Sequence, residues 1–258
     1  ECSVMSEKNL GLPFDIHGGG MDLIFPHHEN EIAQCCGAHG EANDPKIFSR
    51  YWIHNAMLNM NGEKMSKSLG NIFYIRDFLK DYPGEVLRLA LLSGHYRQPL
   101  NWTDDTIEQS KTILDRFYRL LKKVEDINVD LNNIESGSSK VLEALCDDLN
   151  TSKALAEINE IAKNLSKADS DELKAKYKTE FLFSAHLIGI LHDSPDSWLG
   201  IGKTQGDADS EKIESLIAER NEARNSKNFE RADQIRSELS DMGIEIEDSA
   251  DGTIWRSK

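Results

Sequence analysis

The sequence predicts an α/β segment, then an all-α segment, then a small mixed α/β domain. Residues 1–60 mix short apolar runs with glycine-rich stretches, as α/β proteins do. Residues 103–192 carry apolar residues at helical spacing, and two helical stretches followed by two alternating, strand-like stretches come after them. The predicted domains are 1–102, 103–192 and 211–258, with a linker at 193–210 that is rich in Ser, Pro, Gly and Asp.

Composition sets broad limits on function. The chain has 258 residues, of which 39% are hydrophobic and 29% charged, as in ordinary globular proteins. No run of about 18 apolar residues occurs, so no membrane span is predicted. The net charge of −15 argues against broad nonspecific nucleic-acid binding, although local basic groups can still contact a partner such as tRNA. The cysteines lack a disulfide-type spacing, so a reduced, cytosolic protein is expected; they are Cys2, Cys35, Cys36 and Cys146.

The first motif is a run of three glycines, Gly18 to Gly20, between His17 and Met21-Asp22. Without Cβ atoms, such a backbone can approach a flat or anionic ligand closely. Taken alone, the run of glycines favours a plain tight turn. Asp22 adds to the binding interpretation, because a carboxylate at this point can accept hydrogen bonds from both hydroxyls of a ribose.

A helix is predicted to start at Pro26 and to carry a possible metal site. His27 and Glu31 are four residues apart and therefore share a helix face. An imidazole and a carboxylate so placed are plausible zinc ligands, and Cys2 could add a thiolate from elsewhere in the chain. The alternative is an ordinary surface pair on the helix. Cys35 and Cys36 are competing thiolates, but a buried structural role is preferred for them.

The stretch around which the sequence is organised is Lys64-Met65-Ser66-Lys67-Ser68, flanked by Gly62 and Gly70. An apolar, β-prone stretch at 51–58 precedes it and predicts a core strand that leads into a loop. Two ammonium groups with hydroxyls beside them suit a mobile loop that closes over phosphates. A solvated Lys/Ser loop is the alternative interpretation, but a match to one particular pentapeptide is specific.

Helices are predicted after this loop, at 72–79 and 83–92, followed by a break at 93–102. Apolar stripes then continue to residue 192 and are assigned to a helical core, with an interruption at Asn150-Thr151. Beyond the linker, helices are predicted at 213–224 and 229–242, and strands at 244–248 and 253–256 around the turn signal Asp251-Gly252.

Together, Glu1-Cys2-Ser3, the stretch from His17 to Glu31 and the Lys64–Ser68 motif resemble cysteinyl-tRNA synthetases, which are class I aminoacyl-tRNA synthetases. The resemblance extends over the whole chain. It implies the second half of a class I Rossmann-like catalytic domain, a helical bundle on the anticodon side, and a small anticodon-binding domain. The first residue is Glu1 and the family's His-Ile-Gly-His motif is absent, so the chain is expected to begin inside the catalytic domain and to be inactive alone.

The resemblance also implies site residues. One zinc per chain would be held by Cys2, His27 and Glu31, together with a fourth ligand, a cysteine of the family's N-terminal part that this sequence lacks. Adenosine would be bound near Gly18, Gly20 and Asp22. Lys64 and Lys67 would stabilise charge on the ATP phosphates during catalysis, and Lys67 would also help to bind ATP. The terminal domain would read anticodon bases through four residues: Arg224, Asp233, Asp248 and Trp255. For Arg224 and Asp233, ordinary surface charge is the alternative interpretation.

The implied activity is that of a cysteine–tRNA ligase: cysteine is adenylated with ATP and magnesium and then transferred to tRNA(Cys). A cytoplasmic monomer is expected. One alternative is a ligase that joins cysteine to an amino sugar, against which the segment from Ile213 to Trp255 speaks, because an amino-sugar ligase has no anticodon to read. The other is a non-catalytic remnant that binds tRNA or zinc.

Overall fold

The computed structural model describes residues 1–40, 44–65, 72–131, 139–201, 207–226, 228–249 and 252–257. The chain divides into two units. The first comprises 1–111 with 135–159, and the second comprises 112–134 with 160–258. Each unit is described by itself below.

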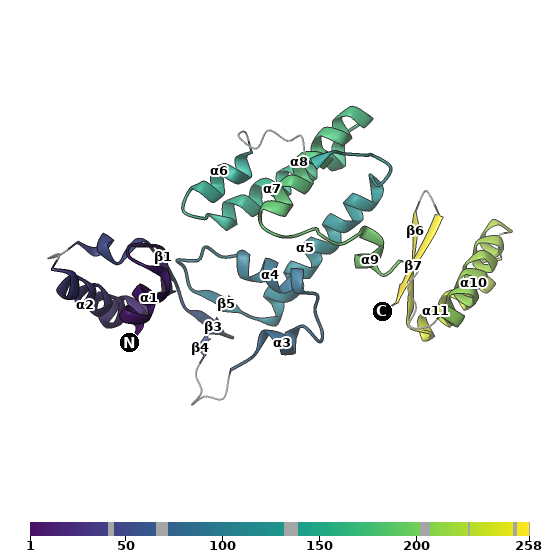
Figure 1. Cartoon of the computed structure of the whole chain (residues 1–258). Coiled ribbons are helices and arrows are strands. Elements are labelled where there is room, and N and C mark those ends of the chain that lie inside the picture. The colour runs from purple at the N-terminus through teal and green to yellow at the C-terminus, as the bar shows by residue number, and fades with distance from the viewer. Residues whose placement is uncertain are drawn as a thin grey trace. The chain divides into compact units, whose positions relative to one another are not determined.

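The N-terminal part of the first unit pairs two parallel strands beside two helices (Figure 1). Its elements are α1 (Cys2–Leu10), β1 (Phe14–Gly20), the short helical turns η1 (Met21–Leu23) and η2 (Ile24–His28), α2 (Glu29–His39), η3 (Pro45–Ile47) and β2 (Ser49–Asn55). The glycine run is therefore the end of a strand and not a tight turn. It pairs in register with β2, with Gly18 opposite Ile53 and Gly20 opposite Asn55.

The predicted strand at 51–58 is two strands in the structure. β2 ends at Asn55, and the amide of Ala56 donates to the carbonyl of Tyr96 at 2.8 Å, outside the first sheet. A second sheet has the order β4-β3-β5, in which β3 is antiparallel to β4 and parallel to β5. The elements of this part are β3 (Leu58–Met60), β4 (Glu63–Lys64), α3 (Ile75–Phe78), α4 (Gly84–Leu92) and β5 (Leu100–Trp102).

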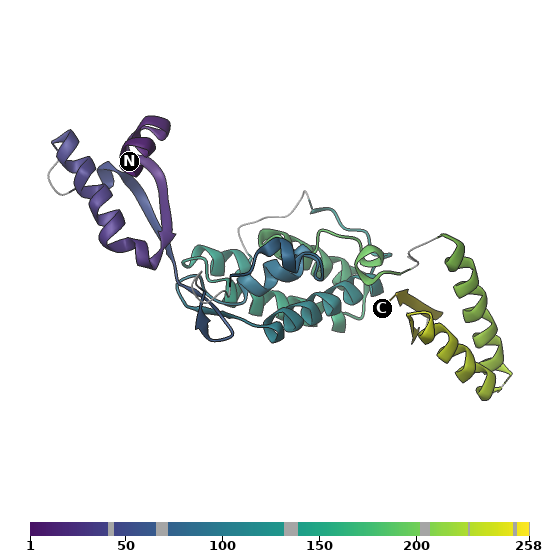
Figure 2. The ribbon, with the colours of Figure 1, turned by 90° about the horizontal axis from the view of Figure 1, so that it is seen from below.

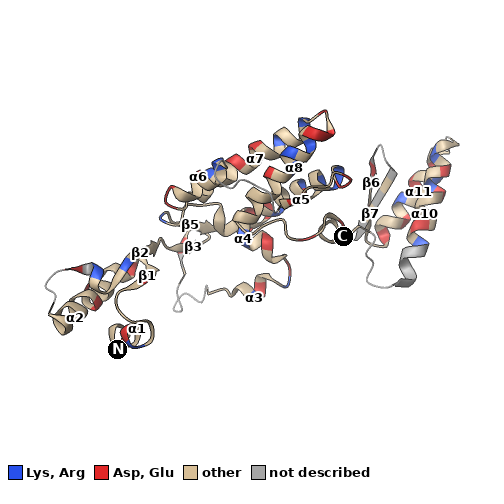
Figure 3. Cartoon of the chain, turned by 45° about the horizontal axis from the view of Figure 1, so that its top comes forward, with Lys and Arg blue, Asp and Glu red and all other residues tan. Residues whose placement is uncertain are grey.

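Long helices follow, as the apolar stripes predict: α5 (Asp104–Lys123), α6 (Lys140–Cys146), α7 (Thr151–Lys167) and α8 (Asp171–Leu187). Leu114, Phe117 and Phe181 have no exposed surface. Within the second unit, the rings of Phe117 and Phe181 pack edge to face with centroids 5.1 Å apart. Figure 3 shows both signs of charge along α7 and α8. The apolar stripes therefore face the core and the charged faces lie outside.

The stretch predicted as a linker is partly helical. It contains α9 (Pro195–Leu199), whose N-terminus is capped by the Ser194 hydroxyl. The Trp198 ring stacks on Tyr118 with centroids 4.5 Å apart, and its indole N–H donates to Asp115 at 2.8 Å. A sequence rich in Ser, Pro and Asp indicates a linker, but Trp198 and the ion pair between Asp196 and Lys122 attach this stretch to α5.

The C-terminal residues form two helices and a hairpin, as predicted (Figure 2). The elements are α10 (Asp207–Asn225), α11 (Phe229–Asp241), β6 (Ile244–Ser249) and β7 (Gly252–Ser257). Their shared core consists of Ile213, Ile217, Ile235, Leu239, Ile244 and Trp255. Ser249 pairs with Gly252, so Gly252 belongs to the strand.

Among the described residues, no helix has the length and apolar character needed to cross a membrane. The α/β, all-α and small mixed segments of the sequence prediction are all present.

Candidate functional site

The structure brings Cys2, His27 and Glu31 together. One ligand atom from each lies within 4.8 Å of the other two. Cys2 begins α1, His27 lies in the turn η2, and Glu31 is in the first turn of α2. The buried Ser3 hydroxyl donates to Gln34 at 2.8 Å and so holds the start of α1 against α2. This contact fixes the residue beside Cys2, although Cys2 and His27 are 25 positions apart in the sequence.

Glu31 is the most informative member of this cluster. It is 3% exposed, and neither carboxylate oxygen makes a hydrogen bond with the described residues. Nε2 of His17 lies 3.0 Å from Oε2 but lacks hydrogen-bond geometry, and Nε2 of His27 lies 3.7 Å from Oε1. A buried carboxylate without hydrogen bonds is unfavourable unless a cation compensates it. Thiolate, imidazole and carboxylate are zinc ligands, so the residues present fit a zinc ion.

Other imidazoles lie beside this cluster and were not singled out from sequence as site residues. His17, His28 and Glu31 form a second group with ligand atoms within 4.8 Å of one another. Nδ1 of His28 lies 2.8 Å from Nε2 of His54, and burial, followed by the charge of His17, lowers the pKa of His28. The His28 ring is thus engaged with His54, and His27 is the imidazole that groups with Cys2.

Parallel strand pairing assembles this histidine group. His17 is opposite Trp52 in the β1–β2 register, and their ring centroids are 4.8 Å apart. His54, two residues beyond Trp52, lies on the same face of β2 and meets His28. These residues are 11 to 37 positions apart, so only knowledge of the strand register could have placed them together.

The glycine run lies at the carboxyl end of β1, the edge where α/β sheets bind ligands. A Cβ at position 19 would lie 2.9 Å from both Cε1 of His28 and Cδ1 of Leu23, and one at position 20 would collide with the Asp22 carboxylate. Position 19 therefore requires glycine, because the His28 ring is buried, whereas at position 20 the exposed Asp22 side chain would have to move aside. Asp22 itself is exposed beside Gly20, so its carboxylate is accessible to a ligand.

The Lys64–Ser68 motif is only partly covered by the described residues. The backbone of Lys64 pairs with Asn59 at the end of β4. The side chain of Lys64, and Lys67 as a whole, lie outside the described residues, so their predicted catalytic and ATP-binding roles stay predictions. A left-handed turn at Asn61 and Gly62, with φ of 50° and 85°, leads into the motif.

In the C-terminal domain, Arg224 and Asp248 contact each other directly. Asp248 also accepts two hydrogen bonds from Arg220, each 2.8 Å long, and one from the Thr253 hydroxyl at 2.9 Å. Arg220, whose side chain is 5% exposed, is the main reason that the pKa of Asp248 lies well below its usual range. Asp233 is exposed on α11. The side chains of Arg224 and Asp233 are thus accessible to a ligand, whereas the carboxylate oxygens of Asp248 are mostly occupied by contacts with Arg220 and Arg224.

The predicted stacking of Trp255 on a base is corrected by its burial. Trp255 is 6% exposed and packs in the domain core against the isoleucines of α10. A ring buried between a helix pair and a hairpin offers no free face to a base. Alternation in β7 places position 255 on the inner face of the strand, and sequence reasoning overlooked this feature.

Three family models match successive parts of the chain. The catalytic domain of class I (C) tRNA synthetases matches residues 1–112. The DALR domain matches 140–192, and the anticodon binding domain of cysteinyl-tRNA ligase matches 208–256. These matches agree in order and type with the α/β, all-α and small mixed segments.

Curated proteins that are similar to this chain are named cysteine–tRNA ligases. The chain is 50% identical over 258 residues to the cysteine–tRNA ligase of Paramagnetospirillum magneticum, covering 99% of the chain and 54% of that protein. It is 48% identical over 259 residues to the cysteine–tRNA ligase of Rhodospirillum rubrum, with the same coverage.

A solved structure, the Agrobacterium radiobacter K84 LeuRS–tRNA–LeuAMS ternary complex, is similar in fold, with a TM-score of 0.55 at 18% identity. The match covers 72% of this chain and 28% of that one. The chain spans about half the length of the curated relatives that it matches. On the three family models and these relatives, the chain belongs to the cysteinyl-tRNA synthetase family.

Proposed function

We propose that this chain is part of a cysteine–tRNA ligase, which adenylates cysteine with ATP and transfers it to tRNA(Cys). The observation that carries the proposal is the convergence of Cys2, His27 and Glu31 around a buried carboxylate without hydrogen bonds. Zinc held there would accept the substrate thiol as thiolate, a far better ligand than the hydroxyl of serine. A site that rewards one ligand atom so strongly needs no editing domain.

The ATP part of the site would lie at the carboxyl end of β1. Gly18 and Gly20 let the backbone approach the nucleotide, and the exposed Asp22 carboxylate would accept the ribose hydroxyls. Lys64 and Lys67 would stabilise the charge that develops on the phosphates, with Lys67 also binding ATP, which is used as its magnesium complex.

The tRNA part of the site would lie in the C-terminal domain. Arg224 and Asp233 are exposed side chains that suit base edges, and Asp248 orients Arg224. The match of residues 208–256 to an anticodon binding domain supports this assignment and speaks against an amino-sugar ligase. A cytoplasmic monomer with one zinc ion per chain completes the proposal.

The test uses a full-length polypeptide that carries this sequence. Purified enzyme with zinc should catalyse cysteine-dependent exchange of pyrophosphate into ATP and should charge tRNA(Cys). Serine should support neither reaction. Exchange that proceeds equally with serine, or charging of an amino sugar in place of tRNA, would contradict the proposal. Zinc binding and tRNA binding without any exchange would favour the non-catalytic alternative.

A further inference from the structure

The turn between α6 and α7 holds an unusual backbone. Asp148 and Leu149 both have positive φ, 55° and 53°, although neither is glycine. Two successive residues of this kind occupy the left-handed region only where surrounding contacts hold them there. Leu149 is 49% exposed, so its own side chain supplies little of that restraint. Part of the restraint is the backbone of α6, since the amides of Leu149 and Asn150 donate to the carbonyls of Leu145 and Ala144, each at 3.1 Å. The Asp148 side chain and the start of α7 add contacts that reach outside the turn.

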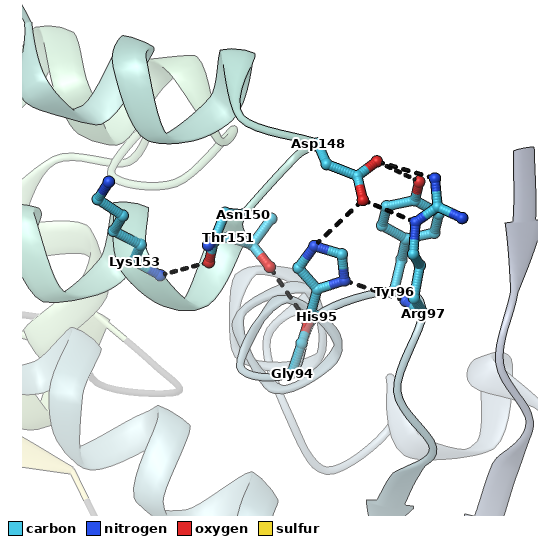
Figure 4. Close-up of polar contacts among 8 residues, drawn as sticks. All are labelled: Gly94, His95, Tyr96, Arg97, Asp148, Asn150, Thr151 and Lys153. Carbon is cyan, nitrogen blue, oxygen red and sulfur yellow. Dashed lines mark hydrogen bonds and ion pairs between the residues drawn. The ribbon is translucent and has the colours of Figure 1, made fainter.

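Asp148 is held by three residues of the α4–β5 loop (Figure 4), of which His95 is the most distant, with Nε2 3.9 Å from Oδ2. Arg97 donates from Nε to Oδ2 at 2.6 Å and from Nη2 to Oδ1 at 3.1 Å, and the Tyr96 hydroxyl donates to Oδ1 at 2.7 Å. The Arg97 and Asp148 side chains are 54% and 48% exposed, so the ion pair itself contributes little to stability. A two-pronged arginine contact joined by a phenol hydroxyl instead fixes orientation.

The first turn of α7 contacts the same loop. The Thr151 hydroxyl donates to the carbonyl of Gly94 at 3.1 Å, and the Ser152 hydroxyl donates to the carbonyl of Ser93 at 3.1 Å. The Asn150 side chain caps the helix by accepting from the amide of Lys153 at 3.1 Å. The α6–α7 turn and the loop are therefore joined by both side chains and backbone.

From this loop, hydrogen bonds lead on to the β3–β4 turn. The Tyr96 carbonyl accepts from the amide of Ala56 at 2.8 Å, and β5, which follows the loop, pairs with β3. The side-chain oxygen of Asn101 in β5 accepts from the amide of Gly62 at 2.7 Å. Gly62 lies two residues before Lys64. One continuous set of contacts thus connects the helical segment with the entrance to the Lys64–Ser68 motif.

We propose that Asp148 is a positioning residue: through Arg97 and Tyr96 it holds the α4–β5 loop, and thereby β5 and the β3–β4 turn that leads into Lys64. The consequence for catalysis rests on the proposed function. Asp148 would act on adenylation only through the described turn at Asn61 and Gly62, which precedes the motif, without touching a substrate. The helical segment would in this way affect adenylation through a structural contact.

The first experiment measures native-state hydrogen exchange in the 258-residue chain. Asp148→Asn keeps the size of the side chain but removes its charge. We expect the amides of Ala56 and Gly62 to exchange about tenfold faster, because the loop and turn would open locally. The matched control is Asp15→Asn, which removes a single exposed contact of 3.3 Å to Arg50 in the same unit and should leave both amides unchanged.

A second variant tests the proposal if the Asp148→Asn chain does not fold. Arg97→Lys keeps the positive charge but cannot make the two-pronged contact. Hydrogen exchange at the same two amides should therefore be faster than in the unmodified chain, by a smaller factor than in Asp148→Asn. Unchanged exchange of both amides in a folded Asp148→Asn or Arg97→Lys chain would overturn the proposal.

The catalytic consequence is measured in a full-length polypeptide with zinc. Asp148→Asn should lower the single-turnover rate constant of adenylation several-fold, with the Kd for ATP unchanged. If hydrogen exchange is faster but the rate constant of adenylation is unchanged, the proposed effect of Asp148 on the Lys64–Ser68 motif would be overturned. Absence of adenylation in the unmodified enzyme would instead refute the proposed function, and the hydrogen-exchange result would still decide the positioning role.

Discussion

Glu31 and Asp248 are two carboxylates that both face basic side chains, yet their surroundings are opposite. Glu31 is 3% exposed and makes no hydrogen bond with the described residues. The Asp248 side chain is 40% exposed and accepts hydrogen bonds from Arg220, Arg224 and Thr253. A carboxylate whose oxygens are used by arginines holds a domain together. One that is buried and unsatisfied is in the state expected of a metal ligand.

The largest expected effect is on zinc binding at Glu31. Glu31→Gln in the 258-residue chain should weaken zinc binding at least about a hundredfold, because an amide is a poor substitute for an anionic ligand. Competition with a chromophoric chelator measures the affinity. Glu29→Gln, on an exposed position of the same helix, is the control and should leave the affinity unchanged. Equal affinities for both variants would show that Glu31 is not a ligand.

The next effect concerns the stability of the C-terminal domain. Arg220→Met should lower the free energy of unfolding of this domain by about 2 kcal/mol, because it leaves Asp248 without its two-pronged partner. Arg224→Met removes a more exposed guanidinium and should cost less than about 1 kcal/mol. Urea titration followed by the indole NMR signal of Trp255 compares the two. Similar losses would mean that burial of the arginine does not matter here.

A smaller effect is expected on tRNA. Arg224→Ala in a full-length polypeptide should weaken use of tRNA(Cys) by about 1–2 kcal/mol, while cysteine-dependent pyrophosphate exchange stays close to normal. Steady-state charging with varied tRNA gives the first value, and exchange gives the second. If both fall together, Arg224 is a structural partner of Asp248 and not a reader of bases.

The smallest effect is the acid dependence of the same domain. Arg220, more than any other group, depresses the pKa of Asp248 in the folded state. The ionised Asp248 carboxylate therefore contributes its full stability above the ordinary carboxyl pKa of about 4, and this contribution is lost as the pH falls below that value. Asp248→Asn should flatten this part of the pH profile, measured by thermal unfolding between about pH 5 and 3. An unaltered slope would assign the acid dependence to other carboxylates.

Local patterns in the sequence were sufficient for much of the fold. The apolar stripes predicted the long helices, and the four-residue spacing placed His27 beside Glu31. The glycine run was harder, because glycine is common in turns and depleted in strands. It forms the end of β1. Trp255 was assigned to base stacking, although alternation along β7 turns it into the core.

Contacts between distant residues could not be predicted from such patterns. The histidine group depends on the register of β1 against β2, which sequence spacing does not contain. The contact of Arg97 with Asp148 spans 51 positions and depends on how α6, α7 and the α4–β5 loop pack. Cys2 was assigned to the zinc site through family resemblance, and its helix lies beside α2 because of Ser3 and Gln34.

The central claim is that Cys2, His27 and Glu31 hold a zinc ion that binds the substrate thiol. X-ray absorption at the zinc edge of the zinc-loaded chain tests it directly. We predict one sulfur at about 2.3 Å with nitrogen and oxygen ligands at about 2.0–2.2 Å, and one additional sulfur when cysteine, but not serine, is added. Cys2→Ser should remove the first sulfur and leave the second. A spectrum without sulfur in the unmodified chain, or one that cysteine does not change, would contradict the account.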